Sequence, residues 1–228
     1  MTGAKRILLS WSGGKDAAWA LQELRERNEG SVVGLLTTVV PEHGRSAMHG
    51  VRLDLIRAQG AAAGLPLLEI PLPWPCSNER YEAACLAGLA HARQMWSATH
   101  VAFGDLFLAD IRAYRERLLT GTGLEPLFPL WQRPTTALLD EMLTAGLRAR
   151  IVCLDPAQLD RRFAGRELDR YTVAELPAEV DRCGERGEFH TFVTAGPMFT
   201  APIPVYPGEV VEREGFVYAD FYQARSHV

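Results

Sequence analysis

The first half of the chain alternates short apolar runs with segments whose apolar residues recur at helical spacing. The apolar runs predict strands over residues 7–10, 32–37, 67–70 and 101–103. The segments between and after them predict helices over residues 16–26, 51–63 and 78–95 and around 111–118. Because strands and helices that alternate in this way are typical of a parallel sheet covered by helices, we expect an α/β fold with a doubly wound sheet.

The pattern changes over residues 126–134, where three prolines close together cannot continue a helix or a central strand. We therefore expect a junction there, between a first domain over residues 1–127 and a second domain over residues 128–228. Beyond it, the sequence predicts a helix over residues 135–145 and an apolar strand over residues 149–154. Alternating segments over residues 203–206 and 216–218 predict edge or antiparallel strands. The second domain is thus expected to be a smaller α+β unit.

Composition narrows the class of protein. Of the 228 residues, 47% are hydrophobic and 23% are charged, which predicts a globular protein and not a disordered one. The formal charge of −4 disfavours nucleic acid or an anionic membrane as a partner. We expect no membrane span and no signal peptide, and four cysteines without a CxxC pair predict reduced thiols in a cytoplasmic protein.

The segment with the clearest chemistry is residues 10–17, SWSGGKDA, between the first predicted strand and the first predicted helix. Gly13 and Gly14 lack a Cβ atom, so backbone N–H groups can converge there, and the positive end of the helix points to the same place. Such a loop binds phosphate. The spacing matches neither a Walker-type loop nor GxGxxG, and an ordinary strand-to-helix turn stays open as an alternative.

The side chains of this segment fit the same prediction. Ser10 and Ser12 offer hydroxyl donors, and Lys15 adds a full positive charge that suits a phosphate group. Asp16 either caps the helix or reaches a magnesium ion held by the phosphates.

The run Ser12-Gly13-Gly14-Lys15-Asp16 resembles the PP-loop of the N-type ATP pyrophosphatases, which belong to the adenine nucleotide alpha hydrolase-like (HUP-like) proteins. Four further segments resemble the diphthine–ammonia ligase family, namely residues 48–51, 103–112, 129–131 and 183–192. Matches in both halves in the same order are more specific than any single one. The chain departs from the family pattern at Ala17, Gln132, Pro134 and Arg186.

The resemblance implies an ATP-dependent ligase of diphthamide synthesis. Such an enzyme cuts ATP between its α and β phosphates, adenylates a carboxylate, and transfers ammonia to give an amide with release of AMP and pyrophosphate. ATP and Mg²⁺ would be its cofactors, and ammonium and a carboxylate, on a protein or a small molecule, its other substrates. The first domain would activate the carboxylate and the second would recognise it, while a homodimer stays open.

Several polar residues follow the predicted strands. In a doubly wound sheet, ligands bind beyond the carboxyl ends of the strands, so Thr37, Met48, His49, Gly104 and Asp105 are expected at a nucleotide site. The His49 imidazole could contact adenine or phosphate, and Met48 could pack on the base, with packing within the loop as the alternative for both. Asp105 would bind magnesium or ammonium, with a helix-capping role as the alternative.

Glu188 and His190 lie in the last of the family-like segments. Two residues apart on a strand, they would project to the same side and could hold the acceptor or deprotonate ammonium. The alternative is a turn with a satisfied carboxylate and a freely titrating histidine. Together with Lys15, they are the candidate catalytic residues.

Two other functions stay open. A PP-loop enzyme that inserts sulfur into RNA would need a reactive cysteine pair and a basic groove, and neither is evident from the sequence. A regulator that binds adenine nucleotides without turnover is compatible with Ala17, which removes one hydroxyl from the loop.

Overall fold

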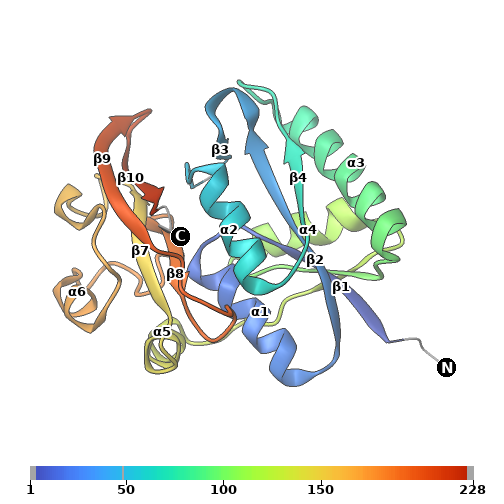
Figure 1. Cartoon of the computed structure of the whole chain (residues 1–228), viewed down its shortest axis with the longest axis horizontal. Helices are drawn as coiled ribbons and strands as arrows, with labels where there is room; N and C mark the ends of the chain where they lie inside the picture. The colour runs from blue at the N-terminus through green and yellow to red at the C-terminus, as the bar shows by residue number, and fades with distance from the viewer. Residues whose placement is uncertain (1–3, 48, 225–228) are drawn as a thin grey trace.

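A computed structural model of the chain describes residues 4–47 and 49–224. Its first part is a mostly parallel sheet with the parallel order β4-β2-β1-β5-β6, to whose strand β2 a short β3 adds in the antiparallel direction (Figure 1). These strands are β1 (Lys5–Ser10), β2 (Gly30–Val40), β3 (Arg45–Ser46), β4 (Leu67–Pro71), β5 (His100–Ala102) and β6 (Glu125–Leu127).

Helices cover both faces of this sheet. They are α1 (Lys15–Arg27), α2 (Leu53–Ala63), α3 (Asn78–Trp96) and α4 (Ala109–Leu119), and a single 3-10 turn, η1 (Pro41–His43), follows β2. Side chains alternate along β1, so that Ile7 and Leu9 join the hydrophobic cluster of α1 and α2 while Leu8 joins that of α3. The predicted doubly wound α/β fold is thereby confirmed.

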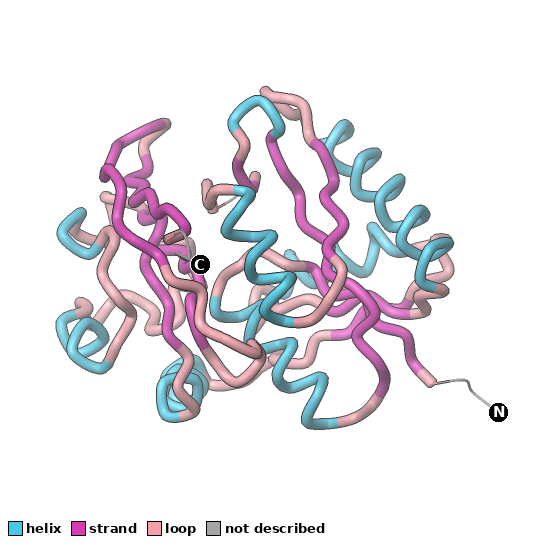
Figure 2. The backbone as a smooth tube through the Cα atoms, in the orientation of Figure 1, coloured by secondary structure: helices cyan, strands magenta, loops and turns pink. Residues whose placement is uncertain are grey.

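The second part is an antiparallel sheet of order β8-β7-β10-β9, beside which the helical segments lie (Figures 1 and 2). Its strands are β7 (Arg148–Leu154), β8 (Phe189–Ala195), β9 (Val205–Arg213) and β10 (Phe216–Gln223), and its helical segments are α5 (Thr135–Thr144), η2 (Arg161–Phe163) and α6 (Arg170–Glu175). A smaller α+β unit was expected here, and the structure has one. The exact boundary between residues 127 and 128 stays a prediction.

The two strands that the sequence analysis did not anticipate are the short ones, β3 and β6. Pro126 lies within β6, which is tolerated because β6 is the edge of the sheet and pairs on one side with β5.

The two sheets share a core. One hydrophobic cluster runs from α1 and α2 to β7, β8 and β10, and it includes Ile56, Phe192 and Val217, all fully buried. At the rim, Arg45 and Arg52 both donate hydrogen bonds to the carboxylate of Asp220 on β10. The second sheet is therefore fixed against α1 and α2, with β8 beside the loop that follows β1.

Among the described residues, no helix is long and apolar enough to cross a membrane. All four cysteines are free thiols.

Candidate functional site

The glycine loop that joins β1 to α1 packs against Ile56 and Gln59 of α2. Gly13 has φ +81°, and a Cβ atom there would lie 2.7 Å from Cδ1 of Ile56, so both conformation and space require glycine. The fully buried amide of Gln59 donates to the carbonyl oxygens of Gly13 (2.9 Å) and Val193 (2.7 Å) and accepts from the indole N–H of Trp11 (2.9 Å). This one side chain connects α2, the loop and β8.

Strand β8 of the second sheet also contacts the loop directly. The N–H of Val193 donates to the carbonyl oxygen of Gly13 at 3.0 Å, and the N–H of Lys15 donates to the hydroxyl of Thr191 at 3.0 Å. A Cβ atom on Gly14 would lie 3.2 Å from the carbonyl oxygen of Thr191. The loop conformation therefore depends on both halves of the chain.

The Lys15 ammonium is buried between the halves. Its side chain is 3% exposed, and Nζ lies 2.8 Å from Oδ2 of Asp16 and donates to the carbonyl oxygen of Cys183. Burial alone would lower the pKa of Lys15, but the surrounding negative charges, Asp16 first among them, outweigh burial and raise this pKa. Lys15 is thus a fixed cation beside the start of α1.

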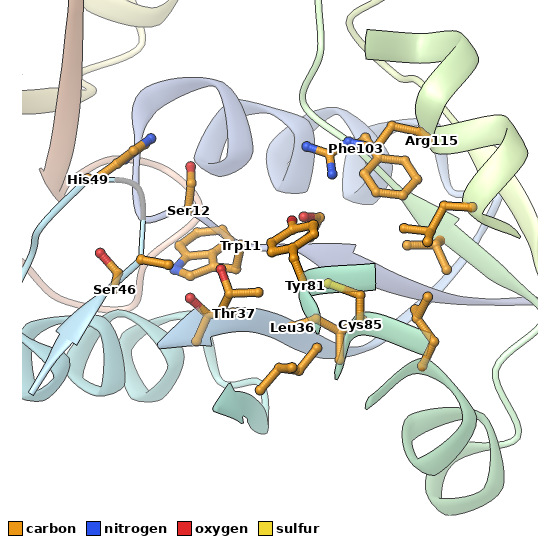
Figure 3. A pocket seen from close by; sticks show the side chains of 17 residues that line it. Trp11, Ser12, Leu36, Thr37, Ser46, His49, Tyr81, Cys85, Phe103 and Arg115 are labelled. Atoms are coloured by element: carbon orange, nitrogen blue, oxygen red, sulfur yellow. The ribbon is translucent and has the colours of Figure 1, made fainter. Parts of the chain in front are cut away.

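A cavity with about 750 Å³ of empty space, open solvent included, lies at the carboxyl ends of β1, β2, β4 and β5 and is bordered by α3 and α4 (Figure 3). Four of the expected residues line it, namely Ser10, Ser12, Thr37 and His49. Its apolar wall consists of Leu36, Ile70, Leu89, Val101, Phe103 and Leu118. A polar rim next to an apolar wall suits a ligand with a charged end and a flat, largely apolar end.

His49 and His190 stack on one another beside this cavity. Their ring centroids are 4.5 Å apart at an interplanar angle of 17°, and Cε1 of His49 is 3.1 Å from the position of a Cβ atom on Gly14. Burial first, and then the positive charge of Lys15, lowers the pKa of His190 to about 4. Burial, with His190 and Lys15, lowers the pKa of His49 well below its usual value. Both imidazoles are therefore neutral at pH 7.

Gly104 brings two carboxylates together. A Cβ atom on Gly104 would lie 2.9 Å from the carbonyl carbon of Asp16, so the loop after β5 packs directly on the start of α1. Oδ1 of Asp16 and Oδ2 of Asp105 are both buried without a hydrogen-bond partner among the described residues. Burial first, opposed by Arg115 and helped by Asp16, raises the pKa of Asp105.

Glu185 adds a third carboxyl group to this region. Burial first, and then the charge of Asp16, raises the pKa of Glu185 to about 8. In the part of the chain that the structure describes, no three His, Cys, Asp or Glu side chains group closely enough to form a metal site by themselves.

Glu188 occupies a different place from His190. It lies one residue before β8 and is 2% exposed, and its two carboxylate oxygens accept the N–H groups of Asp181 (2.7 Å) and Arg186 (2.8 Å). Its carboxylate therefore shapes the loop before β8, whereas the His190 ring faces His49. Met48 lies outside the residues that the structure describes.

Sequence reasoning missed three residues that organise the site, Gln59, Glu185 and Thr191. A signal for Gln59 did exist, because an amide on the apolar stripe of the predicted helix over residues 51–63 needs buried partners. Glu185 lies in a segment that the sequence analysis did single out, but the candidate catalytic carboxylate named there was Glu188.

A parallel sheet with helices on both faces and a cavity at the carboxyl ends of its strands defines an α/β protein with a ligand crevice in the usual place. The family model of the diphthamide synthase N-terminal domain matches residues 5–126, and that of the diphthamide synthase C-terminal domain matches residues 134–225. The chain belongs to the diphthamide synthase family, which confirms the resemblance seen in the sequence.

Curated relatives named diphthine–ammonia ligase match about half of the chain. The Schizosaccharomyces pombe protein is 31% identical over 116 residues, which are 49% of this chain and 19% of that protein. The Homo sapiens protein is 34% identical over 118 residues (49% and 44%), and the Danio rerio protein is 32% identical over 130 residues (54% and 50%). In each of the three, the match spans half of the relative's length or less.

Proposed function

We propose that the chain is an ATP-dependent ligase that converts a carboxylate and ammonia into an amide and releases AMP and pyrophosphate. The observation that carries the proposal is the glycine loop, held by α2 and β8 at the edge of a cavity in the ligand crevice of the sheet. The relatives named diphthine–ammonia ligase support the same reaction class.

The nucleotide would lie across the cavity. The N–H groups of Gly13 and Gly14, the Ser12 hydroxyl and the amino-terminal end of α1 would bind its phosphates, because backbone donors at a helix start favour anions. The adenine ring would pack on the apolar wall near Thr37. Lys15, whose ammonium is turned toward Asp16 and Cys183, would act on the leaving pyrophosphate through its charge from behind the loop and not by direct contact.

Asp16 and Asp105 would hold the magnesium ion. Oδ1 of Asp16 is buried without a hydrogen-bond partner among the described residues, Asp105 adds a second carboxylate beside it, and Mg²⁺ is commonly bound by one or two carboxylates together with substrate phosphates. When bound, Mg²⁺ would neutralise part of the phosphate charge.

The chemistry has two displacement steps. A carboxylate oxygen of the acceptor attacks the α-phosphorus of ATP, and the bond to pyrophosphate breaks. Ammonia then attacks the acyl carbon, the bond to AMP breaks, and the nitrogen loses a proton. The neutral imidazole of His190 beside the loop would orient ammonia by accepting a hydrogen bond, the proton that the nitrogen loses would pass to water, and Glu188 would support His190 by holding the preceding loop.

The acceptor would enter through a second cavity between the two sheets. This cavity has about 1150 Å³ of empty space, open solvent included, and it shares Ser46 and Ala47 of its lining with the nucleotide cavity. Its other walls come from the end of β2, the loop of the half-exposed Trp74, and the β9–β10 hairpin. The second half of the chain would thus recognise the acceptor.

The test is to incubate the protein with ATP, Mg²⁺, ammonium and a panel of small carboxylic acids and carboxylate-bearing peptides. AMP and pyrophosphate should form in equal amounts, and only when both ammonium and the correct carboxylate are present. ADP and orthophosphate as products would contradict the proposed bond cleavage. ATP binding without turnover across the panel would favour the regulator instead.

A Gly13→Ala variant tests the loop itself. It should lose nucleotide-dependent activity, because its Cβ atom would meet Ile56 in a left-handed backbone conformation. Gly146→Ala is the matched control, since Gly146 has a similar φ of +86° and no described atom lies within 4 Å of its added Cβ.

A further inference from the structure

The nucleotide cavity has an unusual balance of charge. Among the described residues that line it, Arg115 of α4 is the one with a permanent positive charge. Lys15, the cation that the sequence puts forward, does not line the cavity, because its ammonium is turned toward Asp16 and Cys183. A triphosphate carries several negative charges, so a cation in the cavity wall could bind one of its phosphate groups.

The guanidinium of Arg115 lies between aromatic rings and forms an ion pair with Asp105 that is longer than a hydrogen bond. It lies over the ring of Phe103, 5.1 Å from its centroid, and 5.9 Å from that of Tyr114. Its Nε is 3.7 Å from Oδ2 of Asp105, which is too long for a hydrogen bond, and both of these atoms are buried without a partner in the described part of the chain. Figure 3 shows Arg115 beside Phe103 at the wall of the cavity.

Arg112, one turn earlier on the same helix, differs in each respect. Its Nε donates to Glu116 at 2.8 Å, and its guanidinium lies 4.7 Å from the ring centroids of both Phe128 and Trp131. It does not line the cavity. Arg112 is therefore hydrogen-bonded to a carboxylate at 2.8 Å, whereas Arg115 lies 3.7 Å from its carboxylate partner and faces the cavity.

We propose that Arg115 binds a phosphate group of the nucleotide in this cavity. The inference rests on the proposed function and adds a residue that neither the loop motif nor the family resemblance singles out. A guanidinium presents paired N–H donors that match two phosphate oxygens. Because the Arg115 side chain already stacks on Phe103, it loses less conformational entropy when it binds a ligand. Asp105, whose Oδ2 lies nearest to Nε, would orient Arg115 so that the outer guanidinium nitrogens meet the ligand.

The experiment compares the affinities of ATP and adenosine, measured by isothermal titration calorimetry with Mg²⁺, for the wild-type protein and for Arg115→Gln. We expect Arg115→Gln to weaken ATP binding by about tenfold or more, as for loss of a charge-assisted hydrogen bond, and to leave adenosine binding within about twofold. Arg115→Lys should recover part of the loss. Unchanged adenosine binding also shows that the variant keeps its folded cavity.

Arg112→Gln is the matched control, because it removes the same charge from the same helix, and it should bind ATP like the wild type. Equal weakening of ATP and adenosine by Arg115→Gln, an ATP affinity equal to that of the wild type, or the same loss in Arg112→Gln would each overturn the inference. The absence of ATP binding by the wild-type protein would overturn the proposed function as well, so the two failures are distinguishable.

Discussion

The side-chain amide of Gln59 donates a hydrogen bond to the carbonyl oxygen of Gly13 at 2.9 Å, in the fully buried space between α2 and the glycine loop. The same amide also reaches Val193 and Trp11, so one residue satisfies three polar groups that have no access to water. The loop is therefore preformed by the protein and does not wait for a ligand to order it.

Replacement of Gln59 by leucine should be strongly destabilising. Two carbonyl oxygens and one indole N–H would lose their partner in a buried site, which should lower the free energy of unfolding by roughly 2–4 kcal/mol. Urea unfolding measures this loss. Gln22→Leu on α1 is the control and should change the value by less than about 0.5 kcal/mol, because its hydrogen bond to Glu26 lies at the surface.

His190 should make stability depend on pH on the acid side. The pKa of His190 is lowered to about 4, so between pH 6.5 and 4 the unfolded chain binds a proton that the folded protein does not. The free energy of unfolding should fall as the pH drops through this window, by up to about 1.4 kcal/mol per pH unit from this residue. His190→Phe should flatten this slope in urea unfolding curves recorded at pH 7 and pH 5.

The exposed His91 provides the comparison, and His91→Phe should keep the wild-type slope. Identical slopes in the wild type and in His190→Phe would refute the assignment of a partly buried imidazole that stays neutral in the folded protein.

Glu185 should make the free energy of unfolding fall as the pH rises, which is the opposite of the effect of His190. Its pKa is raised to about 8, so between pH 4.5 and 8 the folded protein holds a proton that the unfolded chain releases, and stability falls as the pH rises. Glu185→Gln removes this titration. The variant should be more stable than the wild type at pH 8, on the order of 2 kcal/mol, and the advantage should shrink toward pH 5.

Thermal or urea unfolding at the two pH values measures the difference. Glu179→Gln, at an exposed position, should show no such dependence on pH. An advantage of Glu185→Gln that is the same at both pH values would argue for a packing effect instead.

Glu188→Gln should loosen the loop before β8. The carboxylate accepts two backbone N–H groups, and an amide can accept only through its single oxygen, so one donor would face an N–H₂ group in a buried site. We expect a loss of about 2 kcal/mol in the free energy of unfolding and faster hydrogen exchange at Asp181 and Arg186. Unaltered exchange at both amides would show that Glu188 is not what holds this loop.

The helices and the longer strands of the first part were predictable because their apolar residues are periodic, whereas α6 and the part of β9 beyond Tyr206 were not predicted. The stripe of Ala17, Ala20, Leu21 and Leu24 is buried in α1 as the helical spacing requires. Strand β3 has two residues, too few to show any period. Strand β6 contains Pro126, which predicts a break in a strand unless the strand is known to lie at the edge of the sheet.

Some residues of the candidate site were predictable from the sequence, and others were not. The rule that ligands bind at the carboxyl ends of parallel strands brought Ser10, Thr37 and His49 to one cavity. Glu188 was expected to share a side of a strand with His190, but the strand begins at Phe189, and no local pattern marks that starting point. The stacking of His49 on His190 depends on how the two sheets pack, which sequence spacing does not encode.

Strand β8 gives the glycine loop a hydroxyl from Thr191 and an amide from Val193, so each half of the chain completes the other. If the chain were cut between its two sheets, the glycine loop would lose its hydrogen bonds to Thr191 and Val193, and β8 would lose its contact with the loop. Chimaeras between relatives must accordingly inherit the loop and this strand as a matched pair.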